Sequence, residues 1–160
     1  MGKKKSSAEE EDSGRRYWLL KTEPSEWSWT DQAAAADNGT ALWDGVRNKQ
    51  AQKNMKSMSP GDLCFFYHSG SGAGSRRVVG VVEVVRGWSE GDEAVEVRAV
   101  GEMRREVGLG EMKERLADRK AEFGLLRQPR LSVVPVHGDI WVRVCEMGGG
   151  YAGDGGDDVA

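Results

Sequence analysis

One short stretch concentrates side chains that could recognise a nucleobase. Trp43, Asp44, Arg47 and Asn48 fall within six residues, immediately before a segment with a helical pattern. An indole stacks on any planar π-system, and the polar groups beside it can hydrogen-bond the edge of a base. The stretch also has an ordinary interpretation, in which Asp44 or Gly45 caps a helix and Trp43 belongs to the core. These residues alone leave both interpretations open.

The segment that follows is predicted to form a helix over residues 46–58 with one apolar and one basic face. The apolar face consists of Ala51, Met55 and Met58. The basic face has the same spacing, because Lys49, Lys53 and Lys56 each precede one of these residues by two positions. Such lysines could hold phosphates, although a solvated face is the alternative. The net charge of −3 excludes binding to nucleic acid by overall charge, so any such binding must depend on a local patch.

An enzyme would need ionisable residues in a different arrangement. Glu23, Asp44, Glu83 and His68 could supply acid–base chemistry, but the sequence shows no nucleophile paired with a base and no phosphate-binding loop. Glu83 lies in a β-branched run and is better explained as a structural carboxylate paired with an arginine. We therefore predict that the protein is not an enzyme. A protein-interaction module that uses the basic helix and the polar ends of the chain is a further alternative.

The cysteines and histidines predict neither a metal site nor a cofactor. Cys64 and Cys145 lie in apolar surroundings without a CxxC motif, which favours buried free thiols, and His68 and His137 show no metal-ligand spacing. No apolar run reaches the roughly 18 residues of a spanning helix and no signal peptide is visible, so we expect a soluble, intracellular protein with no membrane partner. The Lys3–Lys5 cluster could be a nuclear address.

The 160 residues suffice for one core and are too few for two comfortable domains. Residues 1–16 contain no large apolar residue after Met1, and residues 148–160 are mostly Gly and Asp. Both ends are therefore predicted to be disordered tails. The remaining residues, 17–147, are predicted to form one domain.

The order of the predicted elements is typical of an α+β domain. Runs of β-branched and aromatic residues predict strands at residues 17–20, 63–67, 78–85, 94–100 and 131–136. Helical spacing and caps predict helices from Ser25 or Ser28 to residue 36, over 46–58 and 109–116, and from Ile140 onward. Short connections favour antiparallel pairing. We expect a small, curved, barrel-like sheet of five or six mostly antiparallel strands with helices packed around it.

Five blocks of the chain, in order, resemble the EVE domain. They are Tyr17–Pro24 (YWLLKTEP), Trp43–Asn48 (WDGVRN), Gly61–Ser69 (GDLCFFYHS), Val79–Val84 (VGVVEV) and Arg130–Val136 (RLSVVPV). The resemblance spans residues 17–147 and implies a PUA-like fold related to the YTH domains, which read methylated adenine in RNA. EVE domains are understood as readers of modified bases. Their eukaryotic group is associated with modified cytosines in DNA, chiefly 5-hydroxymethylcytosine, and with the nucleus.

The resemblance also implies a binding site around the end of the first strand, with Trp43 as an aromatic wall. The expected base ligands are Lys21, Thr22, Glu23, Trp43, Asp44, Arg47, Asn48, His68, Ser69 and Trp88. The family usually has a long loop closed by a tryptophan where this chain has only residues 86–93. Trp88 therefore either replaces that tryptophan or leaves a second wall missing. Phosphate contacts are expected from Lys49, Lys53 and Lys56.

Residues and resemblance together predict a monomeric, non-catalytic reader in the nucleus. It would hold a modified base, 5-hydroxymethylcytosine or 5-methylcytosine in DNA, flipped out of its stack against Trp43. A modified base in RNA, a modification-dependent enzyme and a protein-interaction module are the alternatives. The first interpretation requires an indole open to solvent beside a space of nucleobase size.

Overall fold

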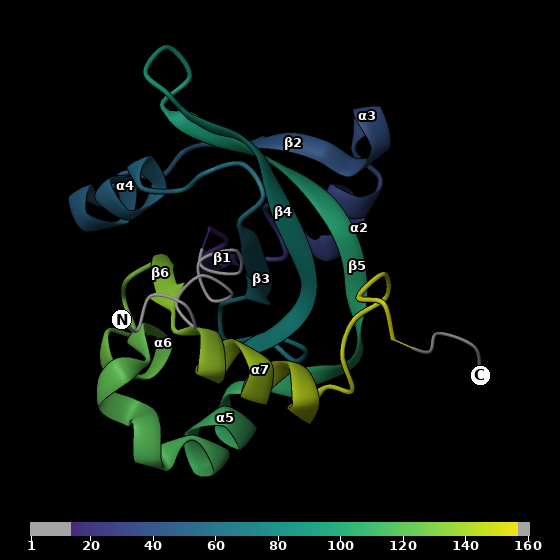
Figure 1. Cartoon of the computed structure of the whole chain (residues 1–160), viewed down its shortest axis with the longest axis vertical. Helices are drawn as coiled ribbons and strands as arrows, with labels where there is room; N and C mark the ends of the chain where they lie inside the picture. Colours follow the sequence, from purple (N-terminus) through teal and green to yellow (C-terminus); the bar gives the residue numbers. More distant parts are fainter. Residues whose placement is uncertain (1–13, 157–160) are drawn as a thin grey trace, which may run out of the picture.

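Figure 1 shows the computed structural model of the chain, which describes residues 14–156. Its centre is one six-stranded mixed sheet in the order β2-β5-β4-β3-β1-β6. The strands are β1 (Tyr17–Thr22), β2 (Thr40–Trp43), β3 (Leu63–His68), β4 (Arg77–Ser89), β5 (Ala94–Gly108) and β6 (Val133–Val136). The predicted α+β fold with a curved, mostly antiparallel sheet is confirmed. The curved sheet is not closed into a barrel, because β2 and β6 form two separate edges.

The helices surround this sheet. They are α2 (Trp29–Ala33), α3 (Ala36–Gly39), α4 (Lys49–Lys56), α5 (Leu109–Arg115), the 3-10 helix η1 (Ala117–Glu122), α6 (Gly124–Arg127) and α7 (Gly138–Met147). In Figure 1, α2 and α3 lie beside β5, α4 lies on the other side of the sheet, and α5, α6 and α7 group at one end. The helical positions expected for α4, α5 and α7 are confirmed, whereas η1 and α6 were not predicted.

The pairing of β1 brings distant parts of the sequence together. β1 runs parallel to β3, with Thr22 opposite His68, and antiparallel to β6 on its other side. The remaining neighbours pair antiparallel. Since Lys21 and Thr22 end β1, their neighbours are the end of β3 and the chain that leads into β6. This junction is where the candidate site forms.

Residues 86–93 form part of a long hairpin and not a shortened loop. β4 continues to Ser89 and pairs with β5, which begins at Ala94. Deeper in the same hairpin, Arg98 donates a hydrogen bond to Glu83 at 2.7 Å, which confirms that Glu83 is paired with an arginine. The hairpin therefore places Trp88 on a strand, where its surroundings are set by the sheet.

The strand β2 was not predicted, although it carries Trp43. Ser28 caps α2 through its side chain, as one of the two expected caps, but the helix stops at Ala33. Asp37 and Asn38 then adopt positive φ values of 60° and 62°, which turn the chain into the edge strand β2. Four residues paired only with β5 carry too little periodicity to signal a strand.

Aromatic residues fill the core beneath the sheet. Trp18 and Trp141 are buried, and the Trp141 ring stacks on Phe65 with centroids 3.8 Å apart, so both tryptophans have a structural role. Cys64 is buried and Cys145 half-buried, both as free thiols. Burial raises the pKa of Cys145 to about 12, which keeps its thiol protonated and inert at neutral pH.

The predicted tails are shorter than expected where the structure describes them. The backbone of Arg16 hydrogen-bonds Asp62 and Leu63. At the other end, residues 148–156 pack along β5: Tyr151 is buried and bridges Met103, and Arg104 pairs with Asp154. The expectation of disorder was therefore wrong for residues 148–156, because the Tyr151 side chain packs in the core. Residues 1–13, with the Lys3–Lys5 cluster, and residues 157–160 lie outside the described part.

Candidate nucleic-acid interface

A cavity of about 890 Å³ opens where the ends of β1 and β2 meet the chain before β6. It is lined by Lys21, Thr22, Glu23, Glu26, Trp27, Leu42, Trp43, Asp44, Gly45, Val46, Arg47, Ser69, Pro129, Arg130 and Ser132. This volume lies within the range of about 300–1,000 Å³ that is typical of ligand sites. Space of nucleobase size is therefore present beside Trp43.

Backbone hydrogen bonds fix three of the segments that line the cavity. The N–H of Lys21 donates to the carbonyl of Ser132 at 3.0 Å, and the N–H of Ser69 donates to the carbonyl of Thr22 at 2.8 Å. The Thr22 hydroxyl donates to the carbonyl of Trp27 at 2.9 Å and holds the turn that follows β1. The position of the site is thus set by sheet pairing and not by side-chain contacts alone.

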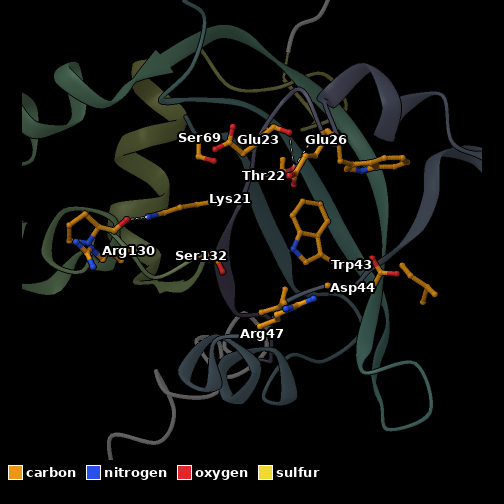
Figure 2. Close-up of a pocket in the computed structure, with 15 residues that line it drawn as sticks. Lys21, Thr22, Glu23, Glu26, Trp43, Asp44, Arg47, Ser69, Arg130 and Ser132 are labelled. Atoms are coloured by element: carbon orange, nitrogen blue, oxygen red, sulfur yellow. Dashed lines mark hydrogen bonds between the residues drawn. The ribbon is translucent and has the colours of Figure 1, made fainter. Parts of the chain in front are cut away.

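Trp43 is more buried than the sequence interpretation required. Its side chain is only 7% exposed and meets the Phe66 ring edge-on, with centroids 5.5 Å apart. The expectation of an indole open to solvent is therefore corrected, because one side of the ring packs on the core. Figure 2 shows the remaining part of the ring pointing into the middle of the pocket. Among the described residues, its Nε1–H has no hydrogen-bond partner.

The turn after Trp43 contains both a helix cap and residues that line the cavity, so each of the two interpretations of this stretch is partly correct. Gly45 has a φ of +77°, a conformation that glycine adopts without steric cost. Asn48, and neither Asp44 nor Gly45, caps α4: its side-chain oxygen accepts a hydrogen bond from the N–H of Ala51 at 2.8 Å. Asn48 is consequently engaged in the helix and does not line the cavity, whereas Asp44 and Arg47 do.

Trp27 forms a second aromatic part of the lining. Its Nε1–H donates to Oε1 of Gln32 at 2.9 Å. Gln32 is fully buried, and its Nε2 donates to the carbonyl of Gly39 at 2.9 Å. The indole of Trp27 is thus held by a buried amide. From sequence this residue could equally have packed on the helix, and its spacing gave no signal that separated the two roles.

The cavity carries both signs of charge without internal pairing. Its cations are Lys21, Arg47 and Arg130, and its carboxylates are Glu23, Glu26 and Asp44. Within residues 14–156, none of the six forms an ion pair. Lys21 donates only to the carbonyl of Pro129, at 2.7 Å, and burial lowers its pKa. Charges left free at a cavity wall are available to a ligand.

Sequence reasoning therefore identified much of the lining and missed the rest. Seven predicted base ligands line the cavity: Lys21, Thr22, Glu23, Trp43, Asp44, Arg47 and Ser69. Arg130 and Ser132 belong to the Arg130–Val136 block that resembles the EVE domain, but they were not predicted to line the site. Glu26 was not predicted either. Nothing in the sequence indicated them, because β1–β6 pairing brings residue 132 beside residue 21.

Besides Asn48, two more predicted base ligands lie outside the lining of the cavity. His68 accepts a hydrogen bond from the N–H of Trp29 at its Nε2, at 3.1 Å, and burial lowers the pKa of the imidazole. Trp88 instead lies beneath the ammonium of Lys56, 5.2 Å from its ring centroid. The second wall expected from Trp88 is therefore not at this pocket, because residues 86–89 continue β4.

The predicted phosphate ligands project from α4, next to the cavity. Lys49 and Lys53 are exposed, and Lys56 covers the Trp88 ring. In the described part of the chain, no group of three or more His, Cys, Asp or Glu side chains is placed to hold a metal ion. No helix among residues 14–156 is long and apolar enough to cross a membrane.

Comparisons with known proteins agree with this architecture. The chain is 36% identical over 95 residues to thymocyte nuclear protein 1 of Gallus gallus; the alignment covers 49% of the chain and 38% of that protein, so the chain spans less than two fifths of that relative's length. The structure of protein Atu2648 from Agrobacterium tumefaciens is 41% identical, with a TM-score of 0.73, and covers 84% of this chain and 94% of that one.

A third relative was solved with nucleic acid. The crystal structure of human THYN1 protein in complex with 5-methylcytosine-containing DNA is 25% identical to this chain, with a TM-score of 0.71, and covers 82% of this chain and 96% of that one. The model of the EVE domain matches residues 16–147, most of the sequence. The chain therefore belongs to the EVE domain family.

Proposed function

We propose that this chain is a non-catalytic, monomeric reader of a modified cytosine in DNA, either 5-methylcytosine or 5-hydroxymethylcytosine. The observation that carries the proposal is the Trp43 indole, which lines a cavity of about 890 Å³ with an unpartnered N–H among the described residues. The complex of human THYN1 protein with 5-methylcytosine DNA supports the same ligand class. Relatives named thymocyte nuclear protein 1 support action in the nucleus.

The target base leaves its stack and enters the cavity against Trp43. Extruding a base costs a few kcal/mol, least where pairing is already weak. Stacking on an aromatic ring returns about 1–3 kcal/mol. The two contributions nearly cancel, so the polar contacts around the base determine whether it stays bound. Trp27, fixed by Gln32, offers further aromatic surface in the same cavity.

The carboxylates suit the edge of a cytosine. The exocyclic N4 amino group of cytosine is a donor, for which Asp and Glu are good acceptors. Glu23, Glu26 and Asp44 line the cavity and form no ion pairs in the part of the chain that the structure describes. The Trp43 Nε1–H is a donor that suits an acceptor on the base. Together they match the donor and acceptor pattern of one base edge.

The substituent on the base would meet a mixed surface. Leu42 and Val46 line the cavity with apolar atoms that suit a 5-methyl group, and Ser69 and Ser132 offer hydroxyls that suit a 5-hydroxymethyl group. Flanking phosphates are held by Lys49 and Lys53 on α4, which are exposed beside the cavity. Such contacts position the strand without reading its sequence.

The test compares two tryptophan substitutions. Oligonucleotides carrying C, 5-methylcytosine, 5-hydroxymethylcytosine or N6-methyladenine, as DNA and RNA, are titrated by fluorescence anisotropy at two salt concentrations. Trp43→Ala is expected to abolish the preference for the modified base, with a loss of at least tenfold in affinity. Trp88→Ala, which removes an equal ring outside the cavity, is the matched control and should leave the preference unchanged. Circular dichroism confirms that both variants stay folded.

Other outcomes identify the alternatives. Equal affinity for modified and unmodified strands that Trp43→Ala does not change would end the reader proposal. A preference confined to RNA would replace DNA by RNA as the ligand. Conversion of a modified base, followed by mass spectrometry of the oligonucleotide, would show an enzyme that uses Glu23 or Asp44. Binding of a protein partner that survives Trp43→Ala would favour an interaction module.

A further inference from the structure

Cations around the cavity differ from three arginines that are paired elsewhere in the protein. On the sheet, Arg77 pairs with Glu106 at 3.0 Å, Arg98 with Glu83 at 2.7 Å and Arg104 with Asp154 at 2.9 Å. Lys21, Arg47 and Arg130, in contrast, have no carboxylate within ion-pair distance in the described structure, although Glu23, Glu26 and Asp44 line the same cavity. Both signs of charge therefore line this site without forming ion pairs in the described part of the chain.

The three cations follow one side of the rim. Figure 2 shows Lys21 and Arg130 together, Ser132 next to them, and then Arg47, which leads into α4. Glu23 and Glu26 lie across the Trp43 ring from Arg47. A hydrogen bond from Asn54 on α4 to the carbonyl of Val133 at 2.7 Å holds α4 against the chain that carries Arg130 and Ser132. The cations thus belong to one connected part of the surface.

Lys21 is the most informative of them. Its ammonium group donates to the carbonyl of Pro129 at 2.7 Å, and Arg130 is the next residue in the chain. Burial that lowers its pKa shows that the fold disfavours this charge in the absence of a partner. An anion bound between Lys21 and Arg130 would remove that unfavourable burial.

We propose that Lys21, Arg130 and Arg47 form a phosphate-binding arc that the backbone of a nucleic-acid strand follows along one rim of the cavity. The inference rests on the proposed function: the strand lies on the arc while its modified base turns toward Trp43 and the carboxylates of Glu23 and Glu26. The ligand is then a nucleotide inside a strand, with phosphates on both sides, and not a free nucleoside. Lys49 and Lys53 extend the arc along α4.

The salt dependence of binding tests the arc. Affinity for a duplex with one 5-methylcytosine and for its unmodified counterpart is measured from low to high salt for Lys21→Met, Arg130→Gln and Arg47→Gln. Each variant should weaken binding to both duplexes by the same factor. Each should also make the negative slope of log K against log salt shallower by about 0.9, the contribution of one phosphate contact. Lys113→Met, an equal loss of charge on the distant helix α5, is the control and should change neither. The nucleoside 5-methyl-2′-deoxycytidine should bind far more weakly than the duplex.

The results separate this proposal from the one before it. The salt slopes of all three variants could be unchanged while Trp43→Ala abolishes the preference for the modified base. This result would overturn the phosphate-binding arc and support the proposed base-reading function. Lower slopes without any modified-base preference would support the arc as a general strand-binding surface and overturn the reader. A nucleoside that binds as tightly as the duplex would also overturn the arc. Arg130 is exposed, and its side chain forms no hydrogen bond or ion pair among the described residues, so Arg130→Gln remains informative even if Lys21→Met fails to fold.

Discussion

Asp62 and the Trp43 pocket each place a carboxylate near an indole, but the polar groups are paired in opposite ways. Asp62 is fully buried and accepts hydrogen bonds from Trp18 Nε1 at 2.9 Å and from the N–H groups of Arg16 and Ser59 at 3.0 Å. At the pocket, the Trp43 N–H and the carboxylate of Asp44 have no such partners in the described structure. The polar groups around Asp62 are satisfied within the fold, whereas those of Trp43 and Asp44 are left free for a ligand.

The largest effect expected from this comparison is on stability. Asp62→Ala removes the acceptor for three donors, and an unsatisfied buried donor costs about 1–3 kcal/mol, so the free energy of unfolding should fall by roughly 3 kcal/mol or more. Asp44→Ala, the same substitution at the pocket, should leave stability nearly unchanged, as exposed substitutions usually do. Urea denaturation followed by tryptophan fluorescence measures both. Equal losses in the two variants would contradict the contrast.

The same contrast explains what the sequence could predict. The Trp43–Asn48 block was recognised by its local chemistry and the end of β1 by its resemblance to the EVE domain, and Lys21, Thr22, Trp43 and Arg47 do line the cavity. Arg130 reaches the site only through the pairing of β1 with β6, a long-range contact that no short pattern records. A match between motif blocks identifies segments, whereas sheet register determines which side chains face the cavity.

Trp88 and Asn48 show the opposite error. Both have residue types suited to base recognition, but Asn48 caps α4 and Trp88 lies under Lys56 on β4. Residues 86–93 were interpreted as a shortened form of the family's long loop, whereas the pairing of Arg86 and Ser89 with β5 extends the hairpin. Local composition predicted the exposure of these side chains poorly, since the length of a hairpin depends on its partner strand.

Gln32 links the two kinds of region and should give an intermediate effect. Gln32→Leu keeps a similar volume but leaves the Trp27 N–H and the Gly39 carbonyl without partners, which should lower the free energy of unfolding by about 1–3 kcal/mol. Because Trp27 lines the cavity, affinity for a modified oligonucleotide should also fall several-fold. Thermal unfolding and anisotropy measure the two effects. Gln50→Leu on the exposed face of α4 is the control, and unchanged affinity in Gln32→Leu would show that Trp27 does not contact the ligand.

The smallest effect concerns pH. It tests whether the residues packed behind Trp43 influence ligand binding at the pocket. Neutral His68 accepts the Trp29 N–H, and the Trp29 ring packs edge-on against Phe66, which in turn contacts Trp43. Burial lowers the pKa of His68, with Glu106 raising it and Arg77 lowering it to smaller extents. The unfolded chain, with a histidine pKa of about 6.5, therefore binds more protons than the folded chain just below that pH. Stability is then fully retained above about pH 6.5 and declines as the pH falls from there toward the folded-state value.

His68→Gln separates this histidine from every other titrating group. A glutamine keeps an acceptor for the Trp29 N–H but takes up no proton, so the decline in unfolding free energy between pH 7.5 and pH 5.5 should be shallower than in the unmodified chain. His137→Gln, a change at an exposed position before α7, should keep the original decline. Affinity for the modified base is measured over the same pH range. If it falls in the original protein and not in His68→Gln, the Trp29–Phe66–Trp43 contacts carry the effect to the pocket. Identical pH profiles in all three proteins would instead mean that the shell behind Trp43 is insensitive to this proton, and that only groups on the rim respond to ionisation.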